Sequence, residues 1–175
     1  LTGTRLGILV MGRIGQKIGK VAKSLGMVIH YHNRSKLDSG KENGAIYHKT
    51  LESLMSVSDV LSVCCPASKE TINLINKKTI SLLPNGAIVT NVARGDIVDD
   101  DALIEALDSK KVSAVGLDVY KNEPKLNPGY LKHSRAFVLP HLGSATFETR
   151  TAMANLAIDN ISEFFETGSC KNKVN

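Results

Sequence analysis

The sequence predicts an α/β fold in which a doubly wound parallel sheet carries helices on both faces. Short apolar runs alternate with longer amphipathic stretches along the whole chain, which is the pattern of repeated β-α units. The first apolar run ends in a glycine-bearing turn, and charged residues follow several later runs. A chain of 175 residues is long enough for one domain with one hydrophobic core.

The expected elements follow one another in a regular order. Compact apolar runs predict strands at 6–10, 28–31, 45–47, 60–63, 87–92, 114–119 and 136–139. Helical spacing of apolar residues predicts helices at 16–25, 51–57, 77–83, 100–107 and about 146–165, the last ending near Gly168. The helix at 100–107 has an acidic first turn, which complements the helix dipole.

The turn after the first predicted strand has a spacing that suits a pyrophosphate. A strand, a glycine turn and a helix in that order aim backbone N–H groups and the positive helix end at a phosphate. Residues 10–15 read V-M-G-R-I-G, so Val10 stands where the G-x-G-x-x-G pattern has its first glycine, and Gly12 and Gly15 keep the other two. We therefore expect a Rossmann-type dinucleotide site with a locally altered turn. The alternative is an ordinary tight turn between a strand and a helix.

The end of the second predicted strand favours NADP(H) over NAD(H). Sites that prefer NAD usually have an acidic residue here, which accepts hydrogen bonds from the adenine ribose and would repel a 2′-phosphate. Residues 32–35 read H-N-R-S and contain no acid. Asn33, Arg34 and Ser35 offer hydrogen-bond donors and a positive charge instead. If Arg34 is only a solvated loop residue, NAD(H) remains the alternative.

Three functional groups follow three successive apolar runs in the second half of the chain. Arg94, Glu123 and His141 each lie just beyond a predicted strand, and the carboxyl ends of parallel strands line one crevice. An arginine can bind a substrate carboxylate through two hydrogen bonds and polarise the adjacent carbonyl. An imidazole can donate a proton near neutral pH, and a carboxylate on its far nitrogen orients it. Together the three suit reduction of a 2-oxo acid, whereas each alone is commonly a loop or structural residue.

With these residues in view, the chain resembles the cofactor-binding domain of the D-isomer-specific 2-hydroxyacid dehydrogenases, and most of all the glyoxylate and hydroxypyruvate reductases. The most specific stretches are 91–103, 116–119 and 140–146. The resemblance implies that Arg94, Glu123 and His141 are catalytic and that Asp118 contacts the nicotinamide carboxamide. It also implies hydride transfer from a nicotinamide cofactor to a small 2-oxo acid such as glyoxylate or hydroxypyruvate, giving the D-2-hydroxy acid.

The cofactor-binding residues that we predict come from the glycine turn, the end of the second strand and the resemblance taken together. They are Met11, Gly12, Arg13, Ile14, Gly15, Asn33, Arg34, Ser35, Cys65, Pro66, Thr71, Val92, Ala93, Asp118, Gly143 and Ser144. Two residues depart from the family pattern. Val10 replaces the usual first glycine, and Cys64 stands where the family commonly has histidine or asparagine.

The resemblance implies that residues 1–175 form the dinucleotide-binding domain, with the substrate-binding lobe mostly absent from this chain. It also implies a homodimer for the full-length protein. The chain is similar to the C-terminal binding protein corepressors too, which leaves open a non-catalytic dinucleotide-sensing protein. Phosphoglycerate and formate dehydrogenases also have similar folds, and the missing lobe would carry much of the evidence that separates them from the reductases.

Composition narrows the setting of the protein. The net charge of +5 and the isoelectric point near 9.1 come from lysines and arginines spread over the chain, which phosphate-bearing cofactors and anionic acids explain without nucleic acid. Cys64 and Cys65 are adjacent and Cys170 is remote, which favours reduced thiols in the cytoplasm. We expect no metal, no membrane span and no membrane partner. The chain opens without a methionine, so a lost targeting segment stays open.

Overall fold

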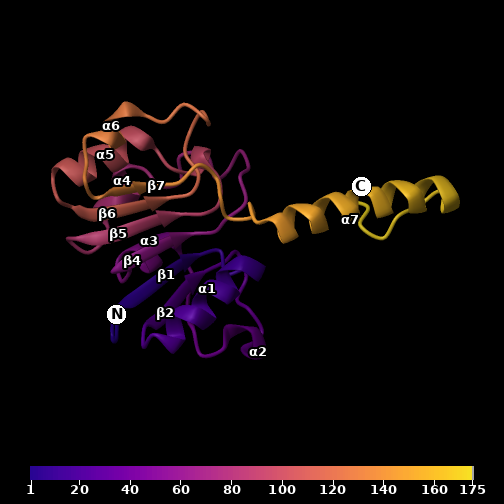
Figure 1. The fold of residues 1–175 in the computed structure, drawn as a ribbon. Helices are drawn as coiled ribbons and strands as arrows, with labels where there is room; N and C mark the ends of the chain where they lie inside the picture. Colours follow the sequence, from indigo (N-terminus) through magenta and orange to yellow (C-terminus); the bar gives the residue numbers. More distant parts are fainter. Residues whose placement is uncertain (175) are drawn as a thin grey trace. The chain divides into compact units, whose positions relative to one another are not determined.

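The computed structural model describes residues 1–174, which fall into two compact units. The first unit is Leu1–Pro140 and the second begins at His141. In the first unit, seven parallel strands form one sheet in the order β3-β2-β1-β4-β5-β6-β7 (Figure 1). The strand order reverses between β1 and β4, and this reversal is the switch point at which open α/β sheets bind ligands. The doubly wound parallel sheet is therefore confirmed.

The elements have the following bounds. The strands are β1 (Arg5–Leu9), β2 (Val28–His32), β3 (Ile46–His48), β4 (Val60–Val63), β5 (Ala87–Asn91), β6 (Val112–Leu117) and β7 (Ala136–Val138). The helices are α1 (Arg13–Ser24), α2 (Ser39–Glu42), α3 (Leu51–Met55), α4 (Lys77–Ser81), α5 (Asp100–Asp108), α6 (Pro128–Leu131) and, in the second unit, α7 (Phe147–Thr167). A short 3₁₀ helix, η1, spans Gly95–Ile97.

Every predicted strand and helix is present, with ends that differ from the prediction by at most three residues. The start of β6 was predicted too late, because Ser113 interrupts the apolar run. Its hydroxyl donates to the carbonyl of Ala87 at 3.3 Å, so the strand continues through it. Helix α1 begins earlier than predicted, at Arg13, directly after the extended residue Gly12. The helices α2 and α6 were missed because four residues each are too few to show a helical period.

Helices cover both faces of the sheet, as predicted. Neighbouring residues of a strand point to opposite faces, and β1 divides its buried side chains accordingly. Leu6 and Ile8 belong to a small core cluster that α1 joins through Ala22. Leu9 belongs to the larger cluster, to which α3, α4 and α5 contribute. The carboxyl ends of the strands are thus held between two packed layers.

The second unit consists mainly of α7, which is 21 residues long. It begins after the N-cap Thr146, whose hydroxyl accepts a hydrogen bond from the Thr149 N–H, and its C-cap is Gly168 with φ of 75°. The predicted end near Gly168 is confirmed. Within residues 1–174, no helix combines the length and the apolar character needed to cross a membrane.

Gly7 in β1 leaves room for the side chain of Ser58 against the sheet. A Cβ at this position would overlap Ser58 Oγ and lie 2.9 Å from Ser58 Cβ. We expect Gly7→Ala to lower the free energy of unfolding by about 1–3 kcal/mol, because a packed core must shift to accept the methyl group. Gly116→Ala in β6 is the matched control, since its Cβ would meet only Thr90 Cγ2, at 3.5 Å. Urea denaturation measures both variants, and equal effects would contradict the packing argument.

Candidate active site

The carboxyl ends of β1, β2 and β4 border a cavity of about 600 Å³, which we call the adenosine-side cavity. Its walls come from the end of β1, the end of β2, α3 and the loop that follows β4. It is lined by Leu9, Val10, His32, Asn33, Arg34, Ser35, Leu51, Cys65, Pro66, Ser68, Glu70, Thr71 and Leu74. The structure therefore brings together the predicted residues of the second strand end with Cys65, Pro66 and Thr71.

A neighbouring cavity of about 440 Å³ lies at the ends of β4 and β5, and we call it the Arg94-side cavity. It is lined by Ile14, Cys64, Cys65, Pro66, Ala67, Val92, Ala93 and Arg94. Both cavities include Cys65 and Pro66, so they adjoin along the carboxyl edge of the sheet. Arg94 thus shares a cavity with predicted cofactor residues that lie far from it in the sequence.

The glycine turn leaves the start of α1 open. Gly12 is the N-cap, no side chain bonds to it, and the first helical turn has no acidic residue. A Cβ on Gly12 would have no protein atom within 4 Å, whereas a Cβ on Gly15 would lie 2.8 Å from the Val10 carbonyl oxygen. The first N–H groups of a helix need acceptors, and the helix dipole favours an anion there. These residues fit the pyrophosphate of a dinucleotide.

One of the three residues after β2 that we predicted to bind the cofactor has a structural hydrogen bond as well. The carbonyl oxygen of the Asn33 side chain accepts a hydrogen bond from the Met11 N–H at 2.7 Å, so it serves the glycine turn. Arg34 and Ser35 are exposed and line the adenosine-side cavity. Met11 itself is 2% exposed, and its N–H and carbonyl are bonded to the side chains of Asn33 and Gln16.

Glu70 is an acidic residue of the adenosine-side cavity that the sequence analysis missed. A hydrogen bond with Ser68 is the main cause that holds the pKa of Glu70 below its usual range, and the positive charge of Arg34 contributes. Its loop is shaped by Thr71, whose hydroxyl accepts from the Ser68 N–H at 2.7 Å. Nothing in the local sequence shows that this loop turns Glu70 toward the end of β2.

Asn91 shapes the turn that presents Arg94. It is 1% exposed at the end of β5. Its side-chain amide donates to the Arg94 carbonyl at 2.8 Å, and its side-chain oxygen accepts from the Ala93 N–H at 3.0 Å. The Arg94 guanidinium donates to the Ala93 carbonyl at 2.6 Å. No role was predicted for Asn91, although a polar residue at the end of an apolar strand run was the available signal.

The loop after β6 carries Asp118 and Glu123. Asp118 is 9% exposed, and its N–H donates to the Asn91 carbonyl at 3.0 Å. Glu123 is exposed, and its Oε1 accepts a hydrogen bond from the Tyr120 N–H at 3.1 Å. A Cβ on Gly95 would overlap the Tyr120 carbonyl group. The absence of a side chain at Gly95 therefore lets the Arg94 turn and the Glu123 loop come together.

Arg13 is exposed at the first position of α1 and lines neither cavity. The other remaining predicted residues belong to the second unit. His141 is its first residue, is exposed and has φ of 56°, in the left-handed region. Gly143 and Ser144 are also exposed. In the first unit, the chain leading to them stays paired with the sheet as far as Leu139, whose N–H donates to the Leu117 carbonyl at 2.8 Å. His141 thus follows two residues after the last strand pairing.

The thiols along the groove are poor nucleophiles. Burial raises the pKa of Cys65 to about 11 and also raises the pKa of Cys64, so both stay protonated near neutral pH. All three cysteines are free. Within the part of the chain that the structure describes, no group of three or more His, Cys, Asp or Glu side chains is placed to hold a metal ion.

A substitution at Gly12 should affect cofactor binding much more than the stability of the fold. We expect Gly12→Ala to lower the thermal unfolding midpoint only slightly, since its methyl group would meet no protein atom within 4 Å and the one cost is that alanine is a weaker N-cap than glycine. The same methyl group should weaken dinucleotide binding by about tenfold or more, because the pyrophosphate must approach this backbone closely. Gly40→Ala, equally open but in α2, is the control. Fluorescence titration with NADPH and NADH measures the affinities, and unchanged binding by Gly12→Ala would refute the placement.

Relatives of this chain are similar to it in sequence and in fold. The 4-methyl-2-oxopentanoate reductase A of Aspergillus oryzae is 40% identical over 95% of this chain and 50% of its own length. The structure of a glyoxylate reductase from Paecilomyes thermophila superposes with a TM-score of 0.94 at 41% identity, covering 99% of this chain and 52% of that one. An NADPH-dependent glyoxylate/hydroxypyruvate reductase from Sinorhizobium meliloti, in complex with NADP and malonate, gives 0.93 at 34% identity, covering 98% and 53%.

These matches extend over nearly the whole chain, which spans about half the length of the curated relatives. The sequence model described as "D-isomer specific 2-hydroxyacid dehydrogenase, NAD binding domain" matches residues 1–143. Those residues contain the glycine turn, both cavities, Arg94, Glu123 and His141. The chain belongs to the D-isomer-specific 2-hydroxyacid dehydrogenase family, as part of its NAD-binding domain.

Proposed function

We propose that this chain is the cofactor-binding part of an NADPH-preferring reductase that converts a small 2-oxo acid into the D-2-hydroxy acid. The observation that carries the proposal is the pair of adjoining cavities. One contains Arg34 and Ser35, the other contains Arg94, and Cys65 and Pro66 line both. An extended dinucleotide along this groove would have its adenosine end at Arg34 and its nicotinamide end toward Arg94.

The cofactor supplies the hydride when it is bound, and the chain supplies its position. The open start of α1 and the bare backbone at Gly12 suit the pyrophosphate. Arg34 is the candidate partner for a 2′-phosphate, because a guanidinium forms strong charge-assisted hydrogen bonds to phosphate oxygens. The relative from Sinorhizobium meliloti, which is described as NADPH-dependent, supports this choice.

Arg94 is the proposed substrate-binding residue. Its turn is held from behind by the buried Asn91, so the guanidinium starts from a defined backbone position. A substrate carboxylate would compete with the Ala93 carbonyl for the guanidinium. Exchanging the Ala93 carbonyl for the substrate carboxylate is favourable, because hydrogen bonds between an arginine and a carboxylate are charge-assisted and can be bidentate. The same cation would polarise the 2-oxo group beside the carboxylate.

His141 and Glu123 are the proposed proton-transfer pair. An imidazole is suited to give a proton to the oxygen of the former carbonyl as the hydride arrives. A carboxylate on its far nitrogen would orient the ring and favour the charged, proton-donating form. Glu123 already accepts the Tyr120 N–H, which anchors that carboxylate within its loop. Asp118, in the same loop, is the proposed contact for the nicotinamide carboxamide.

The substrate class follows from the relatives that match this chain. The relatives described above are named as reductases of 4-methyl-2-oxopentanoate, glyoxylate or hydroxypyruvate. All three substrates are 2-oxo acids. We propose glyoxylate or hydroxypyruvate as the substrate of this protein, with the remaining half of the protein supplying the substrate-binding lobe.

Free thiols support a cytoplasmic setting. Exposed apolar residues on and next to α1, namely Val21 and Leu25, support a homodimer.

The catalytic assignment is tested in the complete protein with glyoxylate and hydroxypyruvate. We expect His141→Ala to lower kcat by about 100-fold or more through loss of general acid catalysis. Arg94→Ala should also raise KM, because it removes a substrate contact. The 175-residue chain alone should bind cofactor and turn over poorly, because closure by a second lobe excludes water. Near-normal turnover by His141→Ala would reject the mechanism, and a complete protein without turnover would favour a dinucleotide-sensing role.

The cofactor preference is tested at Arg34. We expect Arg34→Ala to weaken NADPH binding by roughly 1–3 kcal/mol and to leave NADH binding nearly unchanged. Glu70→Gln should have the opposite effect on NADPH affinity. It removes a negative charge from the same cavity and should therefore strengthen NADPH binding selectively. Isothermal titration with both cofactors measures these effects. Equal losses for NADPH and NADH in Arg34→Ala would contradict the 2′-phosphate assignment.

A further inference from the structure

Val10 has a backbone conformation that a β-branched residue rarely adopts. Its φ is 69°, in the left-handed region that favours glycine. The other non-glycine residues with positive φ within residues 1–174 are three asparagines, a lysine and a histidine. Val10 is therefore the β-branched one among them, and it stands directly before the glycine turn. Such a conformation persists only where surrounding contacts impose it.

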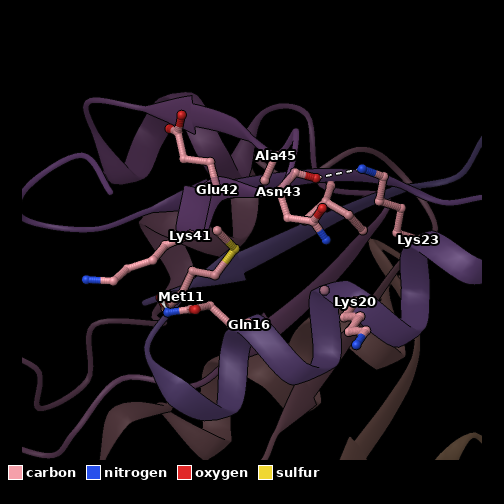
Figure 2. Close-up of a pocket in the computed structure, with 10 residues that line it drawn as sticks. Met11, Gln16, Lys20, Lys23, Lys41, Glu42, Asn43 and Ala45 are labelled. Carbon is pink, nitrogen blue, oxygen red and sulfur yellow. Dashed lines mark hydrogen bonds between the residues drawn. The ribbon is translucent and has the colours of Figure 1, made fainter. Parts of the chain in front are cut away.

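The contacts around Val10 show what imposes this conformation. The Val10 N–H still pairs with the sheet, donating to the His32 carbonyl at 2.9 Å. One residue further, β1 has ended, and the Met11 N–H donates to Asn33 Oδ1 at 2.7 Å. On the other side of the same residue, Gln16 Nε2 donates to the Met11 carbonyl at 3.4 Å (Figure 2). The peptide groups on both sides of Met11 are thus held, the first of them by a short bond.

The packing of Met11 and α1 leaves the turn little room to move. The Met11 side chain is 2% exposed and, as Figure 2 shows, lies between Gln16 of α1 and the segment that carries Ala45. The Val10 carbonyl oxygen lies against Gly15, where a Cβ would be only 2.8 Å away. A turn that relaxed at Val10 would have to move this carbonyl. The Met11–Asn33 hydrogen bond is the polar contact that opposes the movement from the side of β2.

We propose that Asn33 is a positioning residue, which holds the left-handed turn at Val10 through Met11 and so keeps the pyrophosphate-binding start of α1 in place. Asn33 then affects NADPH and NADH alike, unlike Arg34 beside it. The hydrogen bond of Asn33 thus offsets the free-energy cost of the left-handed conformation at Val10, and the two effects are coupled. This inference rests on the proposed function only for its use of the two cofactors as probes.

The coupling is tested with Asn33→Ala, Val10→Gly and the double variant in the 175-residue chain. Asn33→Ala should weaken NADPH and NADH binding by the same factor, about fivefold, which is typical of one lost hydrogen bond. Glycine adopts the left-handed conformation without steric cost. Val10→Gly alone should therefore keep or improve affinity, and in its background Asn33→Ala should cost less than about twofold.

Amide hydrogen exchange gives a readout that does not depend on cofactor. Exchange of the Met11 N–H, followed by NMR, should become about tenfold faster in Asn33→Ala. Asn33→Asp is the matched control, because it keeps an oxygen acceptor. Its Met11 exchange should match the parent, while its negative charge should weaken NADPH binding more than NADH binding. If neither cofactor binds the parent chain, the proposed function fails and the Met11 exchange still decides the role of Asn33.

Three results would overturn the proposal. They are parent-like Met11 exchange in Asn33→Ala, a loss of affinity confined to NADPH, and the same loss with and without Val10→Gly. Thermal unfolding identifies a variant that does not fold. If Asn33→Ala is unfolded and the double variant is folded, the rescue supports the coupling. If the double variant is also unfolded, glycine does not relieve the turn and the proposal is wrong.

Discussion

The close approach of α1 to the end of β1 is the constraint on which the site depends. At this junction the Val10 carbonyl oxygen and the Ile8 side chain would both lie within 3 Å of a Cβ on Gly15. The contact sets the direction in which α1 starts, and it leaves the first helical N–H groups facing open space beyond Gly12. The start of α1 is therefore shaped by close backbone packing together with the hydrogen bond between Met11 and Asn33.

Three loops at the carboxyl edge of the sheet are shaped in the same manner. In each, a polar side chain bonds to nearby backbone and so fixes the positions of its neighbours. Asn33 accepts from Met11, Thr71 accepts from Ser68, and Asn91 bridges Ala93 and Arg94. Each loop thereby loses freedom before a ligand arrives, and this preorganisation lowers the entropic cost of binding.

The charged residues at the carboxyl edge of the sheet fall into two separate cavities. Arg34 and Glu70 line the adenosine-side cavity, whereas Arg94 lines the other. The protonated thiols of Cys64 and Cys65 contribute bulk without charge. Relatives that match this chain over about half of their length are named for different 2-oxo acids, 4-methyl-2-oxopentanoate and glyoxylate.

Local periodicity and the spacing of glycine and charge were enough to predict the alternation of strands and helices, the glycine turn and the position of Arg94 after a strand. The partners of the polar side chains, in contrast, depend on the packing of the folded chain. The Asn33 side-chain oxygen bonds to a backbone amide 22 residues away, and Glu70 shares a cavity with Arg34 through a loop fold that no periodicity records. Side-chain partners of this kind are set by strand order and loop packing, which bring distant residues together, whereas sequence patterns report only the backbone near each residue.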